Sequence, residues 1–157
     1  MIENLDFRNG PFLVFKSTGN KAQRGHVTDT ECRPDFTAAF EEHWGVDNTT
    51  LWPCIRLAGE QASKGKSRAQ QKKQAITYLH YLLLARPDLY VAQGLLTSIK
   101  GIMFLFGIGG NGIRQFSATW DDNLYKLMYA FIYRLYEPGH FKDPTYVAMV
   151  PDLQKTM

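Results

Sequence analysis

Residues 68–85 constrain the fold of this chain more than any other stretch. Their second half, Ala75-Ile-Thr-Tyr-Leu-His-Tyr-Leu-Leu-Leu-Ala85, is apolar nearly all round and lacks any helix-breaking residue. A helix of that composition is stable only when it is packed inside a core. Arg86-Pro87-Asp88 ends it, because the residue before a proline disfavours the helical conformation. The sequence therefore predicts a long buried helix, which needs a sheet to cover it.

Short runs with strand character stand on both sides of this helix. They are 11–17, 33–40 and 52–59 before it, and 89–98, 101–107 and 112–120 after it. The first linker is polar, and Pro34 suits the start of a strand. The last three runs are joined by two and four residues, which predicts an antiparallel meander.

A second helix is expected from Asp121 or Asp122 to about Tyr136, with an acid capping its positive end. Its apolar residues recur at helical spacing and predict one buried stripe, formed by Leu124, Leu127, Met128, Phe131, Ile132 and Leu135. The predicted class is α/β, with a mixed, largely antiparallel sheet flanked by two long helices. At 157 residues we expect one domain, with a core at about 11–136 and a C-terminal tail at 137–157.

The composition is that of a folded protein, with 45% hydrophobic and 21% charged residues. A net charge of +3 is too small to indicate nucleic acid by itself. Cys32 and Cys54 predict free thiols and no disulfide framework. No signal peptide is recognisable, and no apolar run approaches the length of about 20 residues that a bilayer requires. We expect an intracellular protein, cytoplasmic or nuclear, without membrane association.

Asp35 and Glu60 are the candidate metal ligands. They lie 25 positions apart, across one strand, a loop and a second strand, so both carboxylates can project from one rim of the sheet. Two carboxylates with a substrate phosphate suit Mg²⁺ or Mn²⁺, and such an ion can activate water against a phosphodiester. The alternative interpretation is that Asp35 simply follows Pro34 in a turn and that Glu60 is a surface acid at the end of a strand.

Gln74 and Tyr78 complete the candidate catalytic group, since positions i and i+4 share one helix face. A site of this kind also needs an ammonium group beside the second carboxylate, to stabilise developing charge. Two positions after Glu60, however, this chain has Ala62. Lys64 is our first candidate to replace that group, with Lys66, Lys72 and Lys73 as others.

Five cations and no acid occupy residues 64–73, namely Lys64, Lys66, Arg68, Lys72 and Lys73. They predict attraction of a nucleic-acid backbone, which carries no sequence information. A solvated loop and helix start is an equally good interpretation.

Tyr125, Tyr129 and Tyr133 form a second surface candidate, on the helix face away from the apolar stripe. Tyrosine is enriched at interfaces, so this face could bind a protein partner or a second copy of the chain. Cover by the C-terminal tail remains the alternative.

The motifs Pro34-Asp35, Glu60-Gln61-Ala62 and Gln74-Ala-Ile-Thr-Tyr78 resemble the PD-(D/E)xK nuclease pattern with the QxxxY helix of its RecB-like branch. The run from about Arg33 to Val147 is similar to the region that precedes the kinase domain in fungal-type protein kinases. The resemblance implies a restriction-endonuclease-like fold and a site made of Asp35, Glu60, Gln74 and Tyr78. No kinase motifs are found in this chain.

Ala62 is the main departure from the nuclease pattern. We therefore expect a degenerate, non-catalytic nuclease-like domain that binds nucleic acid or protein. An active magnesium-dependent nuclease with a migrated lysine is one alternative. A structural domain that oligomerises through its tyrosine face is another.

Overall fold

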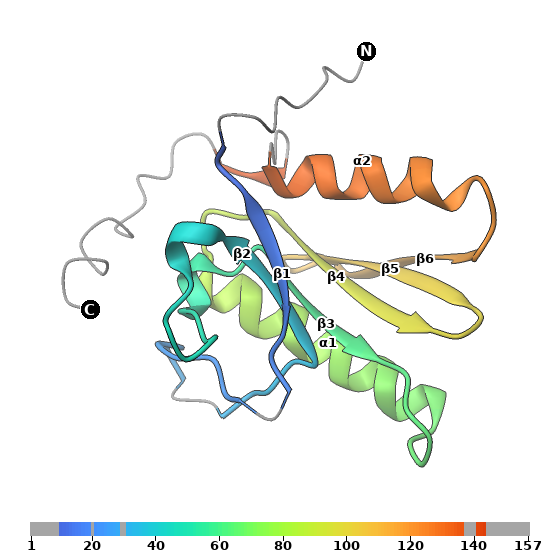
Figure 1. The fold of residues 1–157 in the computed structure, drawn as a ribbon, viewed down its shortest axis with the longest axis horizontal. Coiled ribbons are helices and arrows are strands. Elements are labelled where there is room, and N and C mark those ends of the chain that lie inside the picture. Colours follow the sequence, from blue (N-terminus) through green and yellow to red (C-terminus); the bar gives the residue numbers. More distant parts are fainter. Residues whose placement is uncertain (1–9, 20, 29–30, 137–140, 144–157) are drawn as a thin grey trace.

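A six-stranded sheet with a helix on each face forms the fold (Figure 1). The computed structural model describes residues 10–19, 21–28, 31–136 and 141–143. The strands follow one another across the sheet in sequence order: β1 (Leu13–Ser17), β2 (Phe36–Phe40), β3 (Leu57–Gln61), β4 (Val91–Ser98), β5 (Gly101–Ile108) and β6 (Gly112–Thr119). The predicted α/β class, with a mixed and mostly antiparallel sheet and two helices, is confirmed.

Only β3 and β4 are parallel among the pairs of this sheet, because helix α1 (Arg68–Ala85) connects them as a crossover. Ser67 caps α1: its hydroxyl accepts from the backbone of Gln70, whose side chain accepts from the backbone of Ser67 in return. Close packing of the helix on the sheet requires Gly94, because a Cβ there would lie 2.9 Å from Leu79.

α1 buries one side against the sheet and leaves the other open. Tyr78, Leu79 and Leu82 are each at most 1% exposed, whereas His80 is exposed and Leu84 is 41% exposed. The expectation of a helix enclosed on nearly all sides was therefore wrong. The helix packs against one face of the sheet only, and the apolar residues on its outer side remain partly exposed to solvent.

Helix α2 (Leu124–Tyr136) covers the opposite face of the sheet. The ring of Phe131 lies 5.1 Å from that of Phe104, and the Gln93 amide donates to the Phe131 carbonyl at 3.0 Å. The buried stripe is narrower than predicted, because Leu127 is 38% exposed. Leu124, Phe131 and Leu135 are the buried members.

The largest differences from the predicted strand boundaries are at the starts of β2 and β3. Trp52–Cys54 forms a short 3₁₀ helix in place of a strand, since Pro53 has no amide hydrogen to donate to a ladder. The third strand therefore begins at Leu57. β2 begins at Phe36, which leaves Asp35 just before the strand. The predicted C-terminal tail lies outside the described residues except for 141–143, where Lys142 bridges to Leu89.

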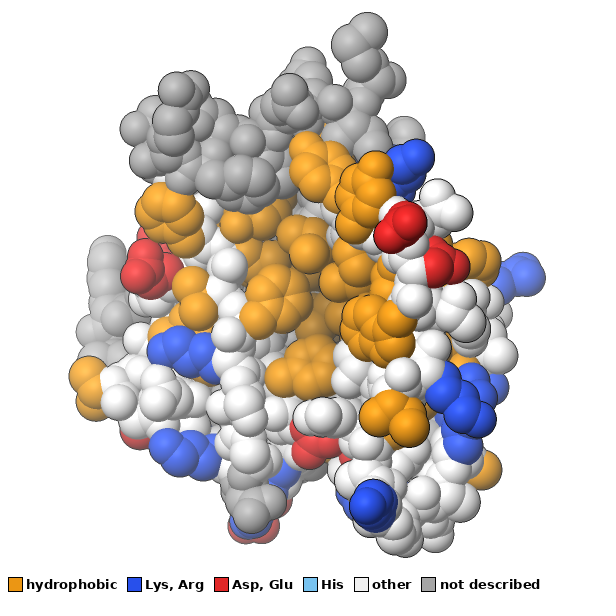
Figure 2. All heavy atoms as spheres, turned by 45° about the vertical axis from the view of Figure 1, so that its right-hand side comes forward, with side chains coloured by type: hydrophobic (Ala, Val, Ile, Leu, Met, Phe, Trp, Pro, Cys, Tyr) orange, Lys and Arg blue, Asp and Glu red, His pale blue; other side chains and the backbone are white. Residues whose placement is uncertain are grey.

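Large hydrophobic side chains remain exposed near β6 and the start of α2. Phe116, Trp120 and Tyr125 are 50%, 56% and 66% exposed. Figure 2 shows hydrophobic side chains gathered in a hollow on the side of the molecule that lies at the right in Figure 1. In the part of the chain that the structure describes, no helix has the length and apolar character to cross a membrane.

Candidate functional site

Asp35 is held where β2 begins and β3 ends. Its backbone amide donates to the Gly59 carbonyl at 3.1 Å, and its Oδ2 accepts the Gln61 amide at 2.9 Å. These bonds fix the carboxylate beside the last residues of β3, because antiparallel neighbours place the start of one strand against the end of the other. Asp35 is only partly buried, so the group is open to a ligand.

Glu60 is the buried member of the carboxylate pair, with a side chain that is 1% exposed. Its Oε1 lies 3.4 Å from Lys66 Nζ, and its Oε2 lies 3.3 Å from Tyr78 Oη. Burial raises the pKa of Glu60, and the negative charge of Asp35 raises it further, whereas Lys66 and Tyr78 oppose the shift. The net effect is a Glu60 pKa above its usual range.

Gln74 and Tyr78 meet this carboxylate from α1, one turn apart. Gln74 Nε2 donates to Tyr78 Oη at 2.6 Å, and the Tyr78 hydroxyl lies 3.0 Å from the Arg33 carbonyl. Burial raises the pKa of Tyr78, so its hydroxyl is neutral across the physiological range. The aspartate, the glutamate, the glutamine and the tyrosine thus come together from three segments of the chain.

The tyrosine has one proton and two acceptors, the Arg33 carbonyl and Glu60 Oε2. If Glu60 is ionised, the hydroxyl can donate to only one of them. If Glu60 is protonated, its own O–H donates to Tyr78 Oη, and the tyrosine donates to Arg33. The second arrangement satisfies every group, which agrees with the direction of the Glu60 pKa.

Lys66 is the lysine that the structure brings to the site. Its Nζ lies 3.2 Å from Gln74 Oε1 as well as 3.4 Å from Glu60 Oε1. Gly65, with φ +96°, reverses the loop between β3 and α1 and turns Lys66 inward. Lys64 is exposed, and it makes no hydrogen bond or ion pair with any residue that the structure describes.

Two carboxylates are available for a metal ion. In the described ranges, no group of three or more His, Cys, Asp or Glu side chains could hold one. Mg²⁺ is often held by one or two carboxylates together with waters and substrate phosphates, so Asp35 and Glu60 fit that minimum. Both oxygens of Glu60 already have a polar neighbour, however, and an ion there would be repelled by the charge of Lys66.

The remaining cations of residues 64–73 surround this cluster. Lys64, Arg68 and Lys73 are exposed, and Lys72 is partly buried. Cations in the first turn oppose the partial positive charge of a helix start, which costs a few tenths of a kcal/mol each. The predicted phosphate-binding surface thus lies at the start of α1, next to Glu60.

Cys32 lies beside this cluster and was not predicted as a site residue. Burial raises the pKa of its thiol to about 12, opposed by a backbone hydrogen bond at Arg33 and assisted by the charge of Glu60. The side chain therefore remains a thiol and adds no charge to the site. Its position three residues before Asp35 was the available signal.

The tyrosine face of α2 is open to solvent at its start. Tyr125 and Tyr129 are 66% and 37% exposed, and Tyr133 is partly buried. Its use as a partner or dimer surface stays a prediction.

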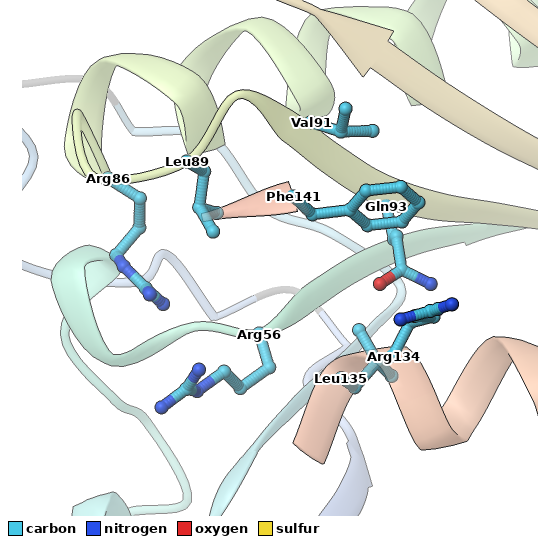
Figure 3. A pocket seen from close by; sticks show the side chains of 8 residues that line it. All are labelled: Arg56, Arg86, Leu89, Val91, Gln93, Arg134, Leu135 and Phe141. Atoms are coloured by element: carbon cyan, nitrogen blue, oxygen red, sulfur yellow. The ribbon is translucent and has the colours of Figure 1, made fainter. Parts of the chain in front are cut away.

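A small cavity lies between the ends of both helices and the start of β4 (Figure 3). Its volume is about 20 Å³, room for roughly one water molecule. Arg86 and Asp88 form a buried two-bond ion pair at 2.8 and 2.7 Å nearby. Burial, with the charge of Arg86, lowers the pKa of Arg56 to about 10, and its guanidinium lies 4.8 Å from the Phe40 ring. This cavity is a packing feature of the fold.

Comparison with known proteins gives no further assignment. No protein family matches the chain, and neither do any curated proteins or solved structures.

Proposed function

We propose that this chain is a nuclease-like module of restriction-endonuclease-like fold that binds a nucleic-acid backbone without cleaving it. The motifs around Asp35, Glu60, Gln74 and Tyr78 support the assignment, together with their convergence at one rim of the sheet. The observation that carries the non-catalytic part is the contact of Lys66 with Glu60.

The ammonium of Lys66 places a positive charge beside Glu60. It lies 3.4 Å from Oε1, and the tyrosine hydroxyl lies 3.3 Å from Oε2, so a metal ion at this carboxyl group would be repelled by the charge of Lys66. Bound Mg²⁺ would lower the pKa of a water and neutralise the phosphate charge. A tethered ammonium can attract a phosphate but cannot supply a metal-bound hydroxide.

Binding is assigned to the four cations beside the site, of which Lys72 is partly buried and the other three are exposed. Arg68, Lys72 and Lys73 lie on the first turns of α1, and Lys64 lies in the loop before it. Contacts of this kind are made to phosphates, so binding should depend weakly on sequence and strongly on salt.

Fluorescence anisotropy with labelled DNA and RNA oligonucleotides, at 50 and 200 mM salt, tests the binding. Replacement of Lys64, Arg68, Lys72 and Lys73 by Gln should abolish binding and flatten the salt dependence. Lys126→Gln on α2 is the matched control and should bind like the wild type. Cleavage of either nucleic acid in Mg²⁺ or Mn²⁺ that disappears in Asp35→Ala would refute the non-catalytic proposal.

An active metal-dependent nuclease is the second candidate, favoured by the partly buried Asp35 carboxylate, which is open to an ion beside Glu60. The ammonium lies 3.4 Å from Glu60, next to where the nuclease pattern requires a lysine. In this case Asp35 and Glu60 would hold Mg²⁺ or Mn²⁺, and Lys66 would stabilise the charge that develops on the phosphate. Lys66→Ala should then abolish cleavage while Lys64→Ala leaves it intact.

A further inference from the structure

A groove with a volume of about 450 Å³ opens beside the carboxylate site. It lies on the sheet face that carries α1, beyond the first turn of that helix. One wall is Ala62, Arg68 and Gln71, and the other is the β4–β5 hairpin from Ser98 to Gly101. Figure 1 shows these elements meeting where the β3 arrow ends. Sites for small organic ligands have volumes of this size.

The floor of the groove continues directly from Glu60. In the sheet register Glu60 is paired with Leu96, Leu96 with Met103, and Met103 with Ser117. Partners in a register point to the same face, so these four side chains form one row across four strands. With about 4.8 Å between strands, the row extends about 14 Å from the carboxylate to the edge strand.

Ala62 keeps this groove open. It stands two positions after Glu60, just past the end of β3, and lines the groove with a single methyl group. A lysine here, as the nuclease pattern has, would extend along the groove. The substitution that removes the motif ammonium thus also creates space for a ligand.

The lining has the chemistry of a site for a flat molecule with a negative charge. Its side chains include two cations, Arg68 and Lys100, and no acid. The floor is apolar at Leu96 and Met103, which are 5% and 6% exposed, and the hairpin tip adds Ile99, which is 95% exposed. Hydroxyl groups such as that of Ser117 also line the groove. An apolar floor suits a nucleobase, and the cationic rim suits its phosphate.

We propose that this groove binds one nucleotide unit, with the base against Ile99 and the exposed edges of Leu96 and Met103, and the phosphate near Arg68 and Lys100. The choice of a nucleotide as ligand rests on the proposed binding of nucleic acid. The existence of the groove is independent of that proposal.

Adenosine 5′-monophosphate, titrated by calorimetry against the full chain, tests the groove directly. We expect saturable binding that is at least tenfold tighter than the binding of adenosine or of inorganic phosphate. Ala62→Leu should weaken it tenfold or more by filling the groove. Lys100→Gln should weaken it severalfold and, at an exposed hairpin tip, should leave the fold intact. Lys126→Gln is the matched control, and circular dichroism checks that each variant folds.

Three outcomes separate this inference from the proposed function. If the mononucleotide does not bind saturably, or binds equally to Ala62→Leu and Lys100→Gln, the groove inference is wrong, even where oligonucleotides bind. If the mononucleotide binds as described but oligonucleotides do not, the groove stands and the nucleic-acid proposal fails. If a folded Ala62→Leu loses the mononucleotide and the four-cation variant loses the oligonucleotide, both are supported.

Discussion

Replacement of Glu60 by Gln should make the protein more stable at neutral pH, although it alters the centre of the candidate site. The carboxyl is fully buried, and its pKa is raised by burial first and then by the charge of Asp35. An amide matches the protonated acid in shape. Its NH₂ can donate to Tyr78 Oη, and its oxygen can accept from Lys66.

The expected gain is about 1–2 kcal/mol. Loss of hydration costs a buried carboxylate several kcal/mol. The ion pair with Lys66 offsets at most about 1 kcal/mol of this cost, because the lysine side chain is 46% exposed. The hydrogen bond with Tyr78 offsets a similar amount. The part of the desolvation cost that these two contacts do not offset is the destabilisation that the Glu60→Gln amide avoids.

The sign of the pH dependence follows from the raised pKa. Below the pKa of an unfolded glutamate, about 4.3, both states of the wild type hold the proton and the stability is fully present. As pH rises towards the folded-state pKa, the unfolded chain loses its proton first, so wild-type stability falls. The Glu60→Gln variant does not lose stability in this way. The difference in the free energy of unfolding between the variant and the wild type should therefore be near zero at pH 4 and largest at pH 8.

Urea denaturation followed by circular dichroism at pH 4 and pH 8 measures the difference. Glu41→Gln is the matched control, since Glu41 is exposed, and it should behave like the wild type at both pH values. A Glu60→Gln variant that is less stable than the wild type at pH 8 would refute the reasoning, because it would show that the ionised carboxylate contributes net stability. A gain at pH 8 would indicate that the acid is retained for function, at a cost in stability.

Three further substitutions test the packing around the site. Tyr78→Phe removes a hydroxyl with three partners and should cost about 2–4 kcal/mol by urea denaturation, and an unchanged midpoint would contradict the network. Asp88→Asn leaves the Arg86 cation buried and should cost about 3–5 kcal/mol at pH 7. Burial alone would raise the pKa of Asp88, but Arg86 holds it below its usual range. The cost of Asp88→Asn should therefore shrink below about pH 4, where the wild-type carboxylate also becomes protonated. A cost that persists at that pH would contradict this prediction. Gly59→Ala places a Cβ within the Phe36 ring and should cost about 3 kcal/mol, with partial rescue by Phe36→Ala in a thermal melt.

Local signals predicted the elements of this fold well wherever one physical rule dominated. The bounds of α1 follow from its apolar content and from Pro87, and the meander follows from two short linkers. The third strand was predicted too early, because apolar residues at Trp52–Cys54 suit a strand while Pro53 favours a turn of 3₁₀ helix. Exposure of Leu127 depends on how far the sheet extends beneath α2, which helical periodicity cannot show.

The candidate site shows the same division between local and tertiary information. Strand and helix periodicity was sufficient to place Glu60 and Tyr78 on facing elements. It could not choose among five cations, because the choice depends on the reversal of the loop at Gly65, whose φ is positive. Lys66 follows that glycine and turns inward, whereas Lys64 precedes it and stays in solvent.

Exchange of the two lysine positions provides the sharpest test of why the site departs from the nuclease pattern. In Ala62→Lys combined with Lys66→Ala, the ammonium moves to the position just past the end of β3, two residues after Glu60, and the loop no longer occupies Oε1. A metal ion could then reach Asp35 and Glu60 without displacing a charge. We expect the double variant to gain Mn²⁺-dependent cleavage of a labelled oligonucleotide. Neither single variant should cleave, because Lys66→Ala alone lacks an ammonium at the site and Ala62→Lys alone keeps Lys66 on Glu60. Loss of the gained activity on Asp35→Ala is the control. A folded double variant that binds Mn²⁺ in calorimetry yet does not cleave would show that the lysine position is not the cause of inactivity.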